Sequence, residues 1–230
     1  MTTFPASSAE EELLARLAAR LADLDARLAA AGRSRETVRL VAVTKARPVA
    51  YVRAAAALGL GVVGENYVDE LESKHAAAVD LDLRWHYLGA LQSNKIGRVL
   101  AAADVMCALA REREVDLIAR RRAGATVYVE VDFTGVPGRP GAQPQDVAAL
   151  VAHARSAGLD VAGLMSVAPP PPAPARAVFD ATRTLADELG LAERSMGMSD
   201  DLEDALAAGS TEIRVGTALF GPRDAAPGLA

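Results

Sequence analysis

The sequence has little cysteine and few aromatic side chains. Of its 230 residues one is a cysteine, Cys107, and 4% are Phe, Trp or Tyr. A single cysteine cannot form a disulfide within the chain, and it fits a reducing compartment. Residues 105–108 around it are apolar, so we expect Cys107 to be a small core side chain in a short strand.

Long apolar runs and net positive charge are also missing. No stretch approaches the roughly 20 apolar residues that span a bilayer. Residues 1–12 are acidic and have no apolar run, unlike a secretory signal. The net charge of −5 and a pI of about 5.3 argue against a surface for nucleic acid or anionic membranes. We therefore expect a soluble, cytoplasmic protein that binds neither.

The chain does have apolar residues in regular patterns, 51% of the total, which is enough for a large core. Near the N-terminus, leucines recur at spacings of three, four and seven residues. This spacing predicts an amphipathic helix over about residues 8–31 that ends at Gly32. Its apolar face consists of Leu13, Leu14, Leu17, Leu21, Leu24 and Leu28.

Short strands alternate with helices along the rest of the chain. The predicted strands cover about residues 40–44, 61–65, 83–88, 105–108, 126–131, 161–165, 193–196 and 211–215. Eight βα units in about 180 residues predict an α/β protein with one (β/α)8 TIM barrel, over about residues 39–223. An open, doubly wound sheet is the alternative, but it usually has a Gly-rich first turn. None follows the first strand, so we expect residues 1–230 to form a single barrel domain.

Lys45 is the most informative single residue, because it ends the first predicted strand. The stretch before it, residues 39–44, is apolar and β-branched, and Pro48 follows. A buried ammonium costs free energy unless it is paired, deprotonated or covalently converted. Three uses are open to such a lysine: an ion pair, a general base, or a Schiff base with an aldehyde.

Other polar or small residues also follow the predicted strands, at the end where TIM barrels place their functional groups. They include Glu65, Asn66, His86, Met165, Ser195, Ser199, Arg214, Gly216 and Thr217. Glycine and hydroxyl residues after the last two strands are typical of a barrel phosphate site, because bare backbone N–H groups can approach the oxygens. Ser199 is also placed to cap a helix that begins near Asp200.

A lysine that can form an imine, beside a rim that can hold a phosphate, suggests pyridoxal 5′-phosphate. A Schiff-base aldolase for sugar phosphates is an alternative, although its lysine usually comes from a middle strand. His86 is either a neighbour of the bound ring or a hydrogen-bonded core histidine. Glu65 is a candidate partner for a cation at the barrel mouth.

Several motifs together resemble those of the pyridoxal phosphate homeostasis proteins. They are Val-Ala-Val-Thr-Lys at 41–45, Gly-Glu-Asn-Tyr at 64–67, Trp-His-Tyr-Leu-Gly at 85–89, Gly-Leu-Met at 163–165, Ser-Met-Gly-Met-Ser-Asp at 195–200 and Ile-Arg-Val-Gly-Thr at 213–217. The resemblance runs from about residue 41 to residue 223. It implies a barrel like the N-terminal domain of alanine racemase, which is fold type III among pyridoxal phosphate proteins.

The resemblance also implies roles for single residues. Lys45 matches the lysine that holds the cofactor as an internal aldimine, and Arg214 matches the arginine that faces the pyridine nitrogen. The phosphate region is matched by Ser195, Ser199, Gly216 and Thr217, and the pocket lining by Asn66, His86 and Met165. Two departures are Thr44 in place of the usual serine, and Arg139 in a loop that usually carries Lys-x-Gly. The role of that loop lysine passes to Arg139 or is lost.

A guanidinium stays protonated, so Arg214 can only donate to the ring nitrogen and disfavours the pyridinium form. The resemblance implies a second difference: alanine racemases take a tyrosine acid/base from a separate domain, for which the end of this sequence leaves no room. We therefore expect a non-catalytic, monomeric carrier that takes part in pyridoxal phosphate homeostasis, with pyridoxal phosphate-dependent enzymes as candidate clients. A low-activity amino-acid racemase is the alternative.

Overall fold

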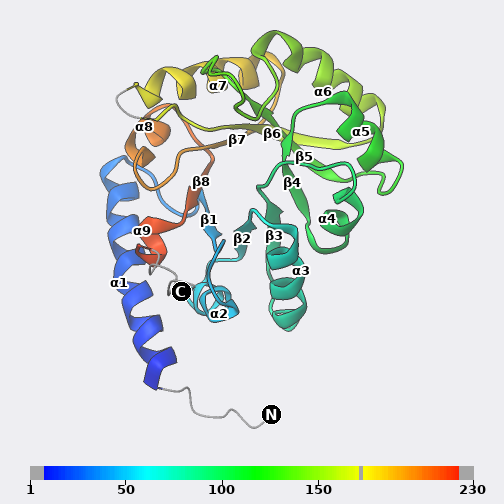
Figure 1. Ribbon diagram of the computed structural model, residues 1–230. Helices are drawn as coiled ribbons and strands as arrows, with labels where there is room; N and C mark the ends of the chain where they lie inside the picture. Colours follow the sequence, from blue (N-terminus) through cyan, green and yellow to red (C-terminus); the bar gives the residue numbers. More distant parts are fainter. Residues whose placement is uncertain (1–7, 171–172, 223–230) are drawn as a thin grey trace.

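The computed structural model describes residues 8–170 and 173–222, and its eight strands close into one parallel barrel in chain order (Figure 1). The first and last strands complete the ring, with Val41 of one opposite Arg214 of the other. The strands are β1 (Arg39–Val43), β2 (Val62–Glu65), β3 (Arg84–Tyr87), β4 (Val105–Leu109), β5 (Thr126–Val131), β6 (Asp160–Ser166), β7 (Glu193–Met196) and β8 (Glu212–Val215). The predicted (β/α)8 barrel is confirmed, while its predicted end at Arg223 lies outside the described residues.

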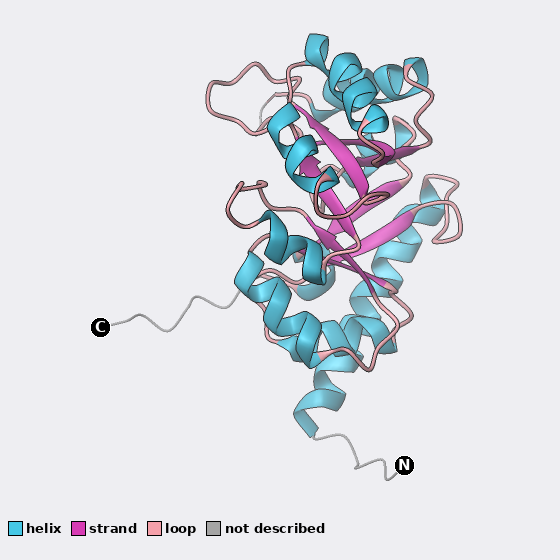
Figure 2. Cartoon of the chain, turned by 90° about the vertical axis from the view of Figure 1, so that its right-hand side faces the viewer, coloured by secondary structure: helices cyan, strands magenta, loops and turns pink. Residues whose placement is uncertain are grey.

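The helices surround the strands, as Figure 2 shows from the side. They are α1 (Ser8–Ala30), α2 (Val49–Ala57), α3 (Val68–Ala77), α4 (Ile96–Ala102), α5 (Glu112–Ala119), α6 (Val147–Ser156), α7 (Ala175–Glu188), α8 (Leu202–Ala207) and α9 (Thr217–Phe220), with a 3-10 turn at Pro144–Asp146. No helix within the described ranges is long and apolar enough to cross a bilayer. The short α9 is absent from the sequence prediction, because four residues are too few to give a periodic pattern.

The apolar core has two parts. The larger part lies between the strands and the helices, and it includes the buried leucines of α1. A smaller cluster fills the inside of the barrel and consists of Val105, Cys107, Ala108, Tyr128 and Met165. Cys107 is therefore a buried core residue, as predicted, and burial raises the pKa of its thiol.

The N-terminal helix α1 lies outside the barrel, alongside α9 and α2 (Figure 1). Its inward face is formed by Leu17, Leu21, Leu24 and Leu28, all of which are buried. Leu14, at the other end of the predicted face, is 37% exposed. The helix therefore packs against the barrel along its last four turns, next to the segment that follows β8.

Candidate functional site

A cavity of about 460 Å³ opens at the carboxyl ends of the strands. Seven of the predicted site residues line it: Lys45, Asn66, Met165, Ser199, Arg214, Gly216 and Thr217. His86 and Ser195 do not line it, and neither does Glu65. The remaining lining residues are Val43, Leu88, Gly89, Ala90, Glu130, Pro140, Val167, Met198 and Asp200.

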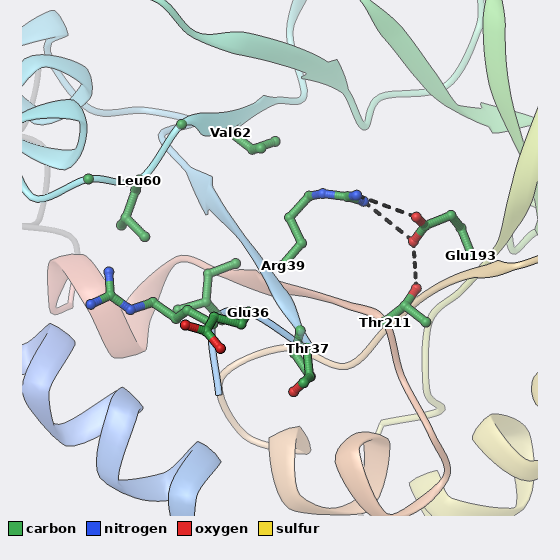
Figure 3. Close-up of a pocket in the computed structure, with 12 residues that line it drawn as sticks. Glu36, Thr37, Arg39, Leu60, Val62, Glu193 and Thr211 are labelled. Carbon is green, nitrogen blue, oxygen red and sulfur yellow. Dashed lines mark hydrogen bonds and ion pairs between the residues drawn. The ribbon is translucent and has the colours of Figure 1, made fainter. Parts of the chain in front are cut away.

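A second cavity, of about 480 Å³, lies at the opposite end of the barrel (Figure 3). There Arg39 pairs with Glu193, and Thr211 donates a hydrogen bond to the same carboxylate at 2.7 Å. Its wall comes from the amino ends of the strands, which in TIM barrels contribute to stability rather than to chemistry. The cavity that contains Lys45 is therefore the candidate site.

Lys45 follows β1 and is half-buried at the edge of the cavity. Its neighbour Thr44 is fully buried, and the Thr44 hydroxyl donates to Glu65 Oε1 at 2.5 Å. Glu65 also pairs with Lys74 of α3 at 2.7 Å, so the cation expected beside Glu65 is present. Burial raises the pKa of the Glu65 carboxyl, and the hydrogen bonds from Lys74 and Thr44 only partly offset this.

Arg214 on β8 is held in one orientation by backbone and side-chain oxygens. Its Nη1 donates to Ser195 O at 2.7 Å and to Ser195 Oγ at 2.9 Å, and its Nη2 donates to Ser166 O at 2.9 Å. Ser195 thus orients Arg214 rather than lining the cavity. Burial lowers the pKa of Arg214, opposed by the charge of Glu212, but a guanidinium remains protonated at neutral pH.

His86 lies deeper in the barrel. Its Nδ1 is 3.6 Å from Glu212 Oε2 and 3.7 Å from Cys107 Sγ, and its ring contacts Tyr128. Burial alone would raise the pKa of the Glu212 carboxyl, but its neighbours His86, Ser195 and Arg39 together outweigh burial and lower that pKa to about 2. Of the two sequence interpretations, the position of His86 matches the core histidine.

Ser199 joins the segments that follow β7 and β8, since its Oγ accepts a hydrogen bond from Ala218 N at 2.9 Å. The predicted cap is wrong: α8 begins at Leu202 and Asp201 precedes it. The reason is a turn that intervenes, closed by the Met198 N–H donating to Asp201 Oδ1. A Cβ on Gly216 would meet nothing closer than 3.7 Å, so the glycine leaves bare backbone at the cavity wall.

Asn66 contributes a buried amide oxygen that accepts no hydrogen bond from the described residues. An unpaired buried polar group costs free energy, so a ligand in the cavity could stabilise this site by donating to it. Gly89 lets its own loop pack closely against this segment, because a Cβ there would lie only 2.1 Å from the backbone carbonyl oxygen of Asn66.

Sequence reasoning missed Glu130 of β5, which lines the cavity and is 6% exposed. Burial raises the pKa of the Glu130 carboxyl to about 7, although the charges of Arg214 and Arg139 act in the opposite direction. The signal was in the sequence: Tyr128 and Glu130 alternate along one strand, and alternate residues face the inside of a barrel.

Arg139, in the loop that departs from the family pattern, donates to Val167 O at 3.3 Å and to Ala168 O at 3.1 Å. It thereby ties the loop to the segment after β6. Pro140 of the same loop lines the cavity, whereas Arg139 does not.

Together these residues fit a small anionic aldehyde. The cavity offers one amine, a fixed guanidinium, a hydroxyl and glycine rim, and an unpaired amide oxygen. Its volume lies within the roughly 300–1,000 Å³ usual for small-molecule sites. No group of acidic, histidine or cysteine side chains suited to a metal ion occurs among the residues with described positions.

Comparisons with known proteins identify the family of this chain. The family model "Alanine racemase, N-terminal domain" matches residues 14–224. The pyridoxal phosphate homeostasis protein of Pseudomonas aeruginosa is 38% identical over 222 residues, which cover 93% of this chain and 95% of the relative. That of Aquifex aeolicus is 34% identical over 206 residues, covering 84% and 90%.

Among solved structures, PipY of Synechococcus elongatus with pyridoxal phosphate bound is 35% identical, with a TM-score of 0.78. The match covers 89% of this chain and 100% of that one. An alanine racemase of Clostridium difficile has a TM-score of 0.76 at 15% identity, and the match covers 93% of this chain but 58% of the racemase. The latter similarity is one of fold alone.

Proposed function

This chain belongs to the alanine racemase N-terminal domain family and, within it, to the pyridoxal phosphate homeostasis proteins; on that premise we propose that it binds pyridoxal 5′-phosphate as a Schiff base, an internal aldimine, on Lys45. The observation that carries the proposal is that Lys45, Arg214 and the rim at Ser199 and Thr217 line one cavity. These residues come from opposite ends of the chain and supply an amine, a ring-nitrogen donor and phosphate donors.

Different residues of the cavity bind different parts of the cofactor in this proposal. Ser199, Gly216 and Thr217 hold the phosphate through hydroxyl and backbone N–H groups. Arg214, fixed by Ser195 and Ser166, would donate to the ring nitrogen and disfavour its protonation. Such a ring supplies only a weak electron sink for reactions of amino acids.

The main function that we propose is to hold and release the cofactor, without strong catalysis. The described residues that line the cavity include no tyrosine, histidine or cysteine that could act as a second acid/base. Release would supply pyridoxal phosphate-dependent client enzymes. We place this role in the cytoplasm, on the grounds of the single, buried cysteine.

A low-activity amino-acid racemase is the second candidate. Glu130 favours it, because a carboxyl that titrates near neutral pH in the same cavity can exchange a proton. Chiral analysis of amino acids incubated with the loaded protein separates the two functions. Robust racemisation would overturn the carrier role.

The chain is well suited to a direct test of Lys45, since it has only three lysines: Lys45, Lys74 and Lys95. Incubation with pyridoxal phosphate should give the visible absorbance band of an imine. Borohydride reduction followed by peptide mass spectrometry should then place the cofactor on Lys45. Lys45→Ala should lose both signals, and Lys95→Ala, a change before α4, should keep them. An unchanged band in Lys45→Ala would contradict the assignment, and no band in the wild type would favour an aldolase.

A further inference from the structure

Lys74 is a buried lysine on an outer helix of the barrel, only 6% exposed. Its Nζ donates to three oxygens: Thr44 O at 2.7 Å, Glu65 Oε1 at 2.7 Å and Glu70 Oε2 at 2.6 Å. Lysine is almost never buried unless it is paired, and buried ion pairs often add little net stability. The position of this ammonium therefore calls for a reason other than stability.

The bonds of this ion cluster end on the two residues that flank Lys45. On one side, the Thr44 carbonyl accepts from Lys74 and the Thr44 hydroxyl donates to Glu65. On the other side, the Ala46 N–H donates to Glu70 Oε2 at 2.8 Å. The backbone of Lys45 is thus fixed before and after its Cα.

The held segment has a backbone conformation that would not persist by itself. Ala46 has a φ of 56°, the left-handed region, and it is the one residue other than glycine with positive φ in the described parts of the chain. For a residue with a Cβ this region is strained, because the Cβ lies too close to the following carbonyl oxygen. Strain of this kind remains only where the surroundings hold it in place. The hydrogen bond from Ala46 N–H to Glu70 is such a restraint.

We propose that Glu65, Glu70 and Lys74 form a clamp that positions Lys45 for imine formation with the cofactor. The inference rests on the proposed function of Lys45. None of the three lines the cavity, so they act through the backbone of residues 44–46 rather than by touching the ligand. They are positioning residues.

The neighbouring ion pairs of α3 provide a matched comparison. Arg98 of α4 pairs with Glu72 of α3, two residues from Glu70 and on an exposed part of the helix. Glu72 has no bond to residues 44–46 among the described contacts. Glu72→Ala thus removes a carboxylate and an ion pair from the same helix without loosening Lys45.

The test compares Glu70→Ala with Glu72→Ala in the full chain. Stopped-flow absorbance follows imine formation with pyridoxal phosphate and its release, and a pH titration of the band gives its midpoint. We expect Glu70→Ala to release the cofactor roughly tenfold faster or more and to shift the midpoint, because small displacements of a reacting group cost large factors in rate. Glu72→Ala should match the wild type in both. Glu70→Gln keeps an acceptor for the Ala46 N–H and should recover most of the loss.

Two further measurements separate positioning from a general loss of stability. In cofactor-free protein, hydrogen exchange at the Ala46 amide should speed up in Glu70→Ala and stay unchanged in Glu72→Ala, while both variants melt at similar temperatures. Lys74→Met should show the largest kinetic effect; since it leaves Glu65 buried without its cation, it can also fail to fold. In that case Glu70→Ala decides the question, because the Glu70 side chain is partly exposed and its loss leaves Glu65 paired with Lys74.

The outcomes distinguish the clamp from the function on which it rests. Imine kinetics and midpoint in Glu70→Ala equal to those of the wild type would overturn the clamp and leave Lys45 as the cofactor lysine. A wild-type protein that forms no imine, or a Lys45→Ala variant that still forms one, would overturn both.

Discussion

Burial acts on single charged residues of the cavity in a way that suits an anionic ligand. It raises the pKa of the Glu130 carboxyl to about 7 and lowers the pKa of Arg214, because a low-dielectric site disfavours the charged form of either group. The guanidinium nevertheless stays charged, while the carboxyl is partly protonated at neutral pH. The cavity is thereby less negative than its residue types suggest.

Glu130→Gln tests this account. Between the ordinary carboxyl pKa and about 7, the folded protein keeps a proton on Glu130 that the unfolded chain releases, so stability falls as pH rises through that range. Glutamine cannot ionise. We expect the variant to gain about 1–3 kcal/mol over the wild type at pH 8 relative to pH 5, measured by urea unfolding of the cofactor-free protein. An equal difference at both pH values would contradict the account.

At the scale of elements, the extra helix α1 supports the rim of the site. It packs beside α9, which carries Thr217 of the cavity wall. Arg27 of α1 also donates to Ser199 O at 3.1 Å and pairs with Glu203 of α8. A helix outside the (β/α)8 pattern therefore connects the segments after β7 and β8.

Two leucines of α1 give a matched pair for measuring this packing. Leu28 is fully buried, so Leu28→Ala should destabilise the protein by about 2–5 kcal/mol through lost burial and a cavity. Leu14 lies on the same helix but is 37% exposed, and Leu14→Ala should cost less than about 1 kcal/mol. Chemical unfolding at one pH compares them. Similar losses in both variants would mean that α1 does not pack as described.

At the scale of the whole molecule, closure of the barrel creates the site. Pairing of β1 with β8 brings Lys45 beside Gly216 and Thr217, although more than half of the chain separates them. Within the described residues, the exposed large hydrophobic side chains are Leu14, Tyr67, Val79, Val136 and Met198. The monomer expected from the sequence stays a prediction.

A measurement of molar mass tests the monomer. Light scattering coupled to size-exclusion chromatography should give a value near 23.9 kDa, independent of protein concentration and of added pyridoxal phosphate. A mass that rises with concentration would contradict it and would direct attention to exposed hydrophobic side chains such as Tyr67 and Met198.

The sequence by itself determined the elements and the kind of chemistry. Apolar and β-branched patterns placed all eight strands and the N-terminal helix to within a few residues. Lys45 after β1, and the glycine and hydroxyl residues after β7 and β8, indicated the cofactor. These are local properties of the chain, visible wherever a pattern is long enough. The four residues of α9 and the turn before α8 were too short to be predicted.

The tertiary structure alone decided which side chains meet. His86 lies beside Glu212 rather than at the cavity wall, and Ser195 accepts a hydrogen bond from Arg214, because strand tilt and register set how deep each inward side chain lies. Lys74 reaches Thr44 across 30 residues of sequence, since α3 packs on β2, the strand that pairs with β1. No local pattern encodes such contacts, because they depend on how distant segments pack together.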